Sequence, residues 1–490
     1  MRTLRPAIRA KRPAPAMTAA DERFARRRPT DHSRLDREAT RHLPPGPRWP
    51  SLLQTVALIR FRHWFVPAMH ARYGDVFTVR ILPRRQPLVL FTRPEHVKEI
   101  FAGDPEVFHA GEGNAILGPV MGEHSLLLLD GPDHQRTRRL LMPAFHGAAL
   151  RGYQRMVAEL ARAEVSCWTP DVPFRSLDRM NALALEVILR VVFGVSDEAR
   201  LARLRPLVNR TVDVSPLVLL GGGHRLLRRL DPWRAMLETQ RALDEVIFAE
   251  IAERRCAPDL ATRTDVLSRL LTSEEEDGLT DQELRDQLAT LLLAGHETTA
   301  TALSWSLYEL ARDAGQLAAA RSAAVRGDTE HLEAVLKESM RLHTVIPMVV
   351  RRLRQPATIG GVDLPRGVNT GPSILLTHAR VDTYGDPEVF RPQRFLDGEV
   401  RTNTWIPFGG GVRRCIGAGF SLMEGVAVLR EVLLRHELSL PEGTVDHPKV
   451  RNITSVPWHG ARIVVRPLAS RLGNADAASL DSGPDKDEVP

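Results

Sequence analysis

The spacing of hydrophobic positions predicts a mainly helical chain. From about residue 51 to about residue 345, apolar side chains recur at every third or fourth position, as on one face of an α-helix. Two short runs near the start, Val76–Leu82 and Pro87–Thr92, are rich in strand-forming residues and predict strands. The expected fold class is therefore mostly α with a small β part.

One helix stands out from this pattern. It begins after Thr280, where the sequence TDQE offers a capping box between Thr280 and Glu283, and it runs to about Arg312. Some 32 residues rising ~1.5 Å each give roughly 48 Å, enough to cross the whole molecule. We expect something important to pack against its middle.

The charge is concentrated at the N-terminus. The formal net charge is +7, and residues 1–48 hold 13 Arg and Lys against 5 Asp and Glu. Residues 1–42 lack an apolar run, so they predict a disordered basic tail; the folded domain is expected over 43–466, and 467–490 as a flexible C-terminal tail. Binding of nucleic acid or acidic lipid by the basic tail is an alternative, which the lack of interleaved aromatics disfavours.

The sequence disfavours a membrane-spanning protein, a disulfide-stabilised protein and a dinucleotide-binding protein. No apolar run is long enough for a transmembrane anchor and no secretion signal is present, so a cytoplasmic location is expected. The three cysteines, Cys167, Cys256 and Cys415, are widely spaced without a CxxC pair, which argues against a disulfide framework or a structural zinc site. The GGG at 221–223 does not continue as a dinucleotide-binding fingerprint.

A glycine-rich stretch precedes Cys415 and suggests a chemical role for this cysteine. It delivers Cys415 to the start of a predicted helix, in which Leu422, Val426, Leu429 and Leu433 have helical spacing. A helix N-terminus favours a thiolate, and glycines let the backbone approach a flat macrocycle. A lone thiolate suits haem iron better than zinc, although a buried cysteine after a turn is the alternative.

The pattern F-x-x-G-x-R-x-C-x-G, formed by Phe408, Gly411, Arg413, Cys415 and Gly417, resembles the haem-binding signature of cytochromes P450. The resemblance extends over roughly 43–466. It implies a single-domain cytochrome P450 fold of the soluble bacterial type, with the long central helix crossing over the haem. Heme b would be the cofactor and Cys415 the axial ligand of its iron.

The middle of the long helix, Ala294–Thr299 (AGHETT), resembles the oxygen-activation motif of that family. By this resemblance Gly295 would open a groove over the iron. Thr298 would hydrogen-bond the bound dioxygen, and Glu297 would help to relay protons. The alternative for Thr298 is a hydroxyl bonded to its own i−4 carbonyl.

Two further sets of residues follow the family's order. Glu338, Arg341 and Arg394 resemble its structural Glu-Arg-Arg triad, although an ExxR pair by itself is worth only about 0.2–0.5 kcal/mol. Four others would contact the haem propionates, because imidazole and guanidinium donors are what a carboxylate needs. They are His134, Arg138, Arg351 and Arg413.

The resemblance implies a monooxygenase that inserts one oxygen atom from O2 into a substrate. No reductase motif is visible, so the electrons would come from an external ferredoxin and ferredoxin reductase. The ferredoxin would dock near Arg413 and Arg414. Aliphatic segments would line the pocket, which favours a lipophilic small molecule. These segments are 108–122, 217–223, 291–298, 344–350 and 453–456.

A monomer without nucleic-acid partners is expected. A haem-thiolate peroxygenase or isomerase is a second possibility, against which Glu297 and Thr298 speak. A haem-based ligand binder or sensor without turnover is a third.

Overall fold

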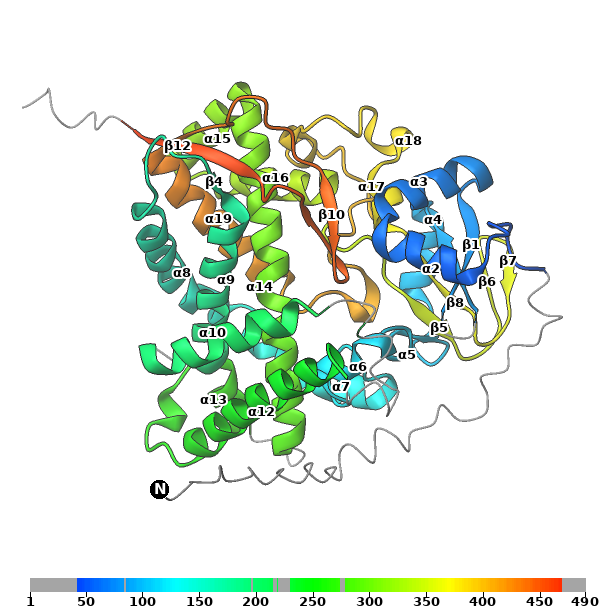
Figure 1. Ribbon diagram of the computed structural model, residues 1–490, viewed down its shortest axis with the longest axis horizontal. Coiled ribbons are helices and arrows are strands. Elements are labelled where there is room, and N and C mark those ends of the chain that lie inside the picture. Colours follow the sequence, from blue (N-terminus) through cyan, green and yellow to red (C-terminus); the bar gives the residue numbers. More distant parts are fainter. Residues whose placement is uncertain are drawn as a thin grey trace, which may run out of the picture.

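The computed structural model describes residues 42–82, 85–194, 197–214, 218, 230–273 and 278–468 (Figure 1). The predicted basic tail, except His42, lies outside the described residues, as does the predicted C-terminal tail, except Pro467 and Leu468. Helices make up most of the described chain and strands a small part, which confirms the expected fold class.

The longer helices are α2 (Ser51–Arg60), α3 (Arg62–Tyr73), α4 (Pro94–Ala102), α7 (Gly131–Leu141), α8 (Ala148–Ser166), α9 (Ser176–Phe193), α10 (Glu198–Val212), α12 (Trp233–Arg255), α14 (Asp281–Arg312), α15 (Ala314–Arg326), α16 (Thr329–Leu342) and α19 (Ala418–Arg435). Shorter ones are α5 (Ala110–Gly113), α6 (Gly118–Met121), α13 (Val266–Leu271), α17 (Ile374–His378) and α18 (Val381–Tyr384).

The largest sheet has the strand order β1-β2-β8-β5-β3, formed by β1 (Val76–Ile81), β2 (Gln86–Phe91), β8 (Asn369–Pro372), β5 (Arg351–Leu353) and β3 (Phe108–His109). Only the β2 and β8 pair is parallel. Smaller sheets pair β6 (Ala357–Ile359) with β7 (Val362–Leu364), β10 (Pro448–Arg451) with β11 (Thr454–Pro457), and β12 (Arg462–Pro467) with β4 (Phe174–Arg175) and β9 (His436–Ser439). The two strands predicted near the start are thus confirmed. In Figure 1 the large sheet, with α2, α3 and α4, lies to the right of the helical part.

Helix α14 confirms the predicted long helix. It has 32 residues, and at its start the Thr280 hydroxyl accepts from the Glu283 amide while the Glu283 side chain accepts from the Thr280 amide. From Leu284 to Leu310 it is buried except at three positions, Ala294, Gly295 and Thr298. It packs closely on α9 and also touches α12, α16 and α19. None of the helices in the described ranges is apolar over a length that would cross a membrane.

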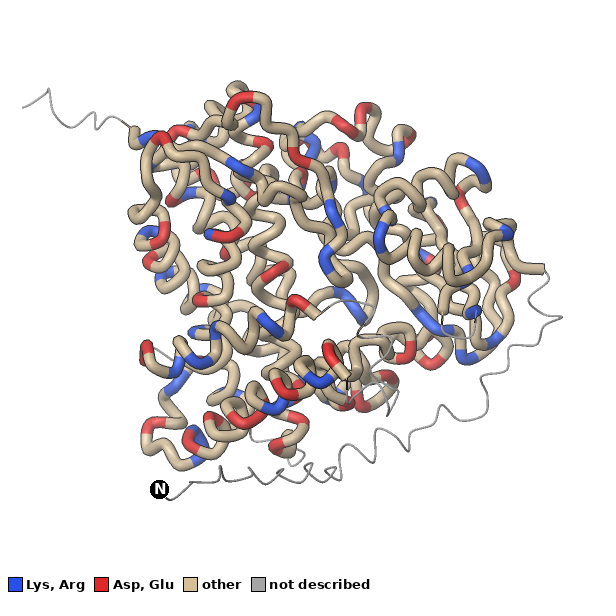
Figure 2. Tube along the Cα trace, viewed as in Figure 1, with Lys and Arg blue, Asp and Glu red and all other residues tan. Residues whose placement is uncertain are grey.

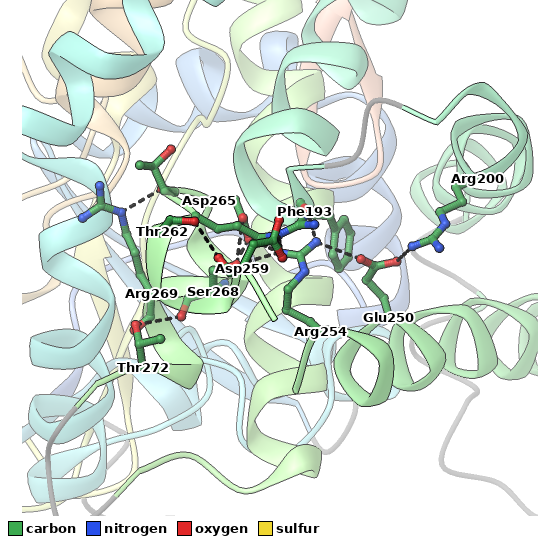
Figure 3. Close-up of polar contacts among 12 residues, drawn as sticks. Phe193, Arg200, Glu250, Arg254, Asp259, Thr262, Asp265, Ser268, Arg269 and Thr272 are labelled. Carbon is green, nitrogen blue, oxygen red and sulfur yellow. Dashed lines mark hydrogen bonds and ion pairs between the residues drawn. The ribbon is translucent and has the colours of Figure 1, made fainter. Parts of the chain in front are cut away.

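A buried polar network holds the helices on one side of α14 (Figure 3). The Arg254 guanidinium at the end of α12 donates to Asp265 at 2.6 Å, Ser268 at 2.7 Å and Glu250 at 2.9 Å, and to the Phe193 carbonyl. Two carboxylates therefore neutralise one buried guanidinium, as a buried charge requires. The network ties α12 and α13 to the end of α9.

Candidate functional site

The glycine-rich loop holds Cys415 at the start of α19. The Cys415 amide donates to the Phe408 carbonyl at 2.9 Å, which closes the loop. Gly411 has φ of +62°, and a Cβ on it would lie 2.0 Å from the Phe101 carbonyl oxygen, so no other residue fits there. Gly417 occupies the N-cap position of α19. The local sequence therefore determines where the thiol lies.

The Cys415 side chain is accessible even though protein atoms crowd around it. Burial raises the pKa of its thiol. The Gly417 amide and the charges of Arg138 and Arg414 act in the opposite direction and favour the thiolate. In the described part of the chain, no group of three or more His, Cys, Asp or Glu side chains could hold a metal ion. The thiol is thus suited to act as a single ligand.

The middle of α14 has a face that protein side chains do not cover. Ala294 is exposed, and Gly295 and Thr298 are half-buried, whereas the other residues from Leu284 to Leu310 are buried. The Thr299 hydroxyl lies 3.1 Å from the Ser421 hydroxyl in the first turn of α19. The uncovered face of α14 therefore lies near the helix that begins after Cys415.

The motif residues on this face differ in what they contact. The Thr298 hydroxyl donates to the Ala294 carbonyl at 2.9 Å, the alternative that helical threonines usually adopt. A Cβ on Gly295 would lie 2.9 Å from the Ile188 side chain of α9, so this glycine also permits close helix packing. Ala294 is the exposed residue of the motif, and its exposure became apparent only in the fold.

Glu297 lies on a different side of α14 and is buried. Its carboxylate is 3.2 Å from the Arg451 guanidinium of β10, which also binds Asp213 after α10. Burial raises the pKa of Glu297 to about 7, Arg451 lowers it, and Asp213 raises it. A carboxyl group with this pKa can both give and take a proton near neutral pH. No motif in the sequence points to Arg451, which lies more than 150 residues after Glu297.

The four residues predicted to contact the propionates, three arginines and one histidine, converge on one region. Burial, together with the charges of Arg413, Arg138 and Arg351, lowers the pKa of His134 to about 3. Burial and the charge of Arg413, opposed by Asp130, lower the pKa of Arg351 to about 10. Arg413 pairs with Asp130, whereas no carboxylate of the described residues lies within 4 Å of buried Arg351. The guanidinium groups in this region outnumber the carboxylates that pair with them, so the region suits an anionic ligand group.

Iron protoporphyrin IX fits these residues. Cys415 provides an accessible thiol, and α14 an uncovered face near it. The cationic region would receive the two propionates. Arg413 belongs to the thiol loop itself, and Arg138 of α7 donates to the Arg414 carbonyl at 2.8 Å and lies close enough to Cys415 to affect its pKa.

Glu338, Arg341 and Arg394 form a buried ion-paired cluster. The Glu338 carboxylate accepts from Arg341 at 2.7 and 2.8 Å and from Arg394 at 3.3 Å. All three side chains are at most 2% exposed. Their remaining donors reach backbone carbonyls between His378 and Val389. The cluster joins α16 to the segment before the thiol loop.

One buried acid in α19 has no ion pair. Glu424 is 1% exposed, and burial alone raises its pKa from 4.5 to about 8. The folded state therefore binds this proton more tightly than the unfolded chain, so the stability contributed by Glu424 falls as the pH rises from about 4.5 to about 8.

The variant Glu424→Gln should abolish this dependence. We expect the variant and the parent to be about equally stable at pH 5, and the variant to be more stable at pH 8.5 by on the order of 2–5 kcal/mol. Urea unfolding of the haem-loaded proteins at both pH values measures the difference. The exposed Glu442→Gln variant is the control; a Glu424→Gln difference that does not change with pH would contradict the prediction.

The predicted pocket segments have different positions. Segment 217–223 lies outside the described residues except for Val218. Segment 291–298 contains the uncovered face of α14, and 344–350 includes half-buried Val349 and Val350. Segment 453–456 starts at Ile453, which is 39% exposed at the turn before buried β11.

Comparisons with known proteins agree with this description. A model of the family described as cytochrome P450 matches residues 43–463. The chain is 52% identical over 442 residues to cytochrome P450 135A1 of Mycobacterium tuberculosis, covering 89% of this chain and 98% of that protein. It is 41% identical over 449 residues to cytochrome P450 135B1 of Mycobacterium bovis, covering 90% and 95%.

Solved structures show the same fold. The haem domain of cytochrome P450DA superposes with a TM-score of 0.73 at 24% identity, over 87% of this chain and 98% of that one. A cyanobacterial CYP120A1 with bound retinoic acid gives 0.75 at 22% identity, over 87% and 100%. Identities this low speak for the fold alone.

Proposed function

Since the chain belongs to the cytochrome P450 family and is a haem-thiolate monooxygenase, we propose that it oxidises a lipophilic small molecule with electrons from a ferredoxin and its reductase. The observation that carries this proposal is the accessible Cys415 thiol near the uncovered face of α14. Bound haem supplies the binding and reductive activation of O2. The residues of this chain hold the haem, position the substrate and move protons.

Cys415, as a thiolate, would bind the haem iron, and the Gly417 amide with Arg138 and Arg414 would stabilise its charge. His134, Arg138, Arg351 and Arg413 would hold the propionates. Phe408, Gly411 and Gly417 would fix the loop, and Glu338, Arg341 and Arg394 would brace the fold behind it. These assignments rest on the contacts of each residue given above.

Thr298 and Glu297 would take part in proton transfer from different sides of α14. The Thr298 hydroxyl donates to Ala294 and keeps its lone pairs for a donor at the uncovered face. Glu297, with a pKa of about 7, would exchange protons with solvent while Arg451 holds it. Gly295, which lacks a side chain and is half-buried, would open a groove over the iron.

The proposed substrate class rests on aliphatic side chains in two of the predicted pocket segments, 291–298 and 344–350. Ala294, Val349 and Val350 are aliphatic and incompletely buried. Apolar linings of this kind favour apolar ligands. For the redox partner, Arg414 is exposed while Arg413 is paired with Asp130, so Arg414 is the better candidate of the two to meet an acidic ferredoxin.

Product formation tests the proposal. We expect NADH-dependent oxygenation of a terpene, steroid or fatty acid when a ferredoxin and ferredoxin reductase are supplied. Equal turnover with hydrogen peroxide alone would favour a peroxygenase. Spectral shifts on ligand addition without product under either condition would favour a sensor.

Substitution of Thr298 tests its proton role. Thr298→Ala should keep haem binding but divert reducing equivalents into hydrogen peroxide, lowering product per NADH by at least about tenfold, since positioned proton donors contribute at least that much. Product and peroxide are measured per NADH consumed. The control is Thr301→Ala, because the Thr301 hydroxyl is buried and donates to the Glu297 carbonyl at 2.8 Å. Unchanged product per NADH in Thr298→Ala would show that the assigned role is wrong.

A further inference from the structure

A surface on α2 and α3 exposes large apolar side chains. Of the seventeen exposed large hydrophobic residues in the described part of the chain, six fall between positions 49 and 64, and the others are spread over the rest. The six, here called the apolar patch, are Trp49, Leu52, Leu53, Val56, Phe61 and Trp64, with exposed fractions from 41% to 64%. Contiguous exposed apolar patches of this kind mark interaction sites.

The helices that carry the apolar patch are fixed to the body by their inner faces. On α2, Ala57 and Leu58 are buried in the same cluster as Phe65 of α3. The Gln54 amide nitrogen donates to the Trp49 carbonyl at 2.7 Å, and its oxygen accepts from the amide of Arg80 in β1, also at 2.7 Å. Because the inner face already supplies the core, core packing does not explain the apolar outer face.

The charge around the apolar patch has one sign. Residues 42–74 contain four Arg and no Asp or Glu, as the tube of Figure 2 shows for this stretch. Arg48, Arg60 and Arg72 are exposed. The 41 residues before this stretch add twelve Arg and Lys against five Asp and Glu. The first described residues lie beside β1, where the Thr78 amide donates to the Pro45 carbonyl at 2.9 Å.

We propose that the apolar patch binds the surface of a lipid bilayer that contains anionic lipids. Exposed apolar side chains bordered by cations are what an interfacial membrane contact requires, and the tryptophans at both ends suit the boundary between headgroups and acyl chains. The arginines and the basic N-terminal segment attract anionic headgroups. Two copies of this chain paired through the patch would instead bring Arg48, Arg60 and Arg72 against like charges, which disfavours self-association.

The apolar patch adjoins a segment predicted to line the substrate pocket. The Arg62 guanidinium of α3 donates to the carbonyls of Asn452 at 2.8 Å and Ile453 at 3.0 Å, and Ile453 is exposed beside it. A bilayer bound here would place this turn against the phase in which a lipophilic substrate dissolves. This last step rests on the proposed function, whereas the lipid contact itself does not.

Vesicle co-sedimentation of the full-length, haem-loaded protein tests the contact directly. We expect binding to vesicles of phosphatidylcholine and phosphatidylglycerol, and weaker binding to vesicles of phosphatidylcholine alone. The triple variant Leu52→Ser, Leu53→Ser, Trp64→Ser should weaken binding at least about tenfold, because three apolar side chains no longer insert. Its reduced carbon monoxide spectrum should stay unchanged, since all three side chains are exposed.

A matched control alters equally exposed apolar residues elsewhere. The variant Val325→Ser, Val381→Ser, Val445→Ser should bind vesicles as the parent does. Tryptophan quenching by lipids brominated in the acyl chain should fall in the Trp49→Phe, Trp64→Phe variant. Vesicle binding that the Leu52, Leu53 and Trp64 changes do not reduce would overturn the proposal. The proposal would also be overturned if neither the parent nor the triple variant bound vesicles, and if the parent self-associated in sedimentation equilibrium while the triple variant did not.

Discussion

Replacing Cys415 by serine should abolish the strongly red-shifted Soret band of the reduced carbon monoxide complex and all NADH-dependent product formation. A serine hydroxyl stays protonated in the surroundings where the Gly417 amide and two arginines favour a cysteine thiolate. Without a thiolate, electron donation to the iron is lost, and with it the cleavage of the O–O bond. The difference spectrum of the dithionite-reduced protein with and without carbon monoxide measures the ligand directly.

The other two cysteines are the matched controls. Cys167 and Cys256 are also free and exposed, and each lies at the C-terminal end of a helix, α8 and α12. Cys167→Ser and Cys256→Ser should keep the band and the activity of the parent. A red-shifted band that survives in Cys415→Ser would assign the thiolate to a different cysteine and with it remove the basis of the proposed site.

The second large effect is expected for Glu338→Gln, with a loss of about 3–5 kcal/mol in the free energy of unfolding. The variant leaves two guanidinium groups, Arg341 and Arg394, buried without their carboxylate. Backbone carbonyls still accept their remaining hydrogen bonds, but none neutralises the charge. Urea unfolding of the haem-loaded protein measures the loss.

Glu333→Gln provides the comparison on the same helix. Glu333 pairs with Lys337 at 2.7 Å, and both side chains are partly exposed, so this change should cost only about 0.3–0.5 kcal/mol. Equal losses in the two variants would mean that burial of the Glu338 cluster contributes nothing beyond an ordinary surface pair. Haem occupancy in Glu338→Gln should decrease together with stability, because the cluster joins α16 to the chain that leads into the thiol loop.

The sequence alone determined the features that depend on neighbouring residues. The capping box at Thr280 and the strands near Val76 and Pro87 appear in the structure within a residue of their predicted positions. The helix predicted at Cys415 begins three residues later, at Ala418. Capping, strand propensity and the turn allowed by glycine are local interactions. The family follows equally from a local pattern, since the residues from Phe408 to Gly417 form one loop.

The tertiary structure decided what depends on residues far apart in the chain. That Glu297 meets Arg451 of β10 follows from how α14 packs beside β11, the partner strand of β10. That Gly295 meets Ile188 follows from how α14 packs on α9. The exposure of the apolar patch on α2 and α3 was likewise invisible in the sequence, where Leu52 and Leu58 have the same hydrophobicity but only the second is buried. Packing chooses which apolar face meets the core, and no local pattern contains that choice.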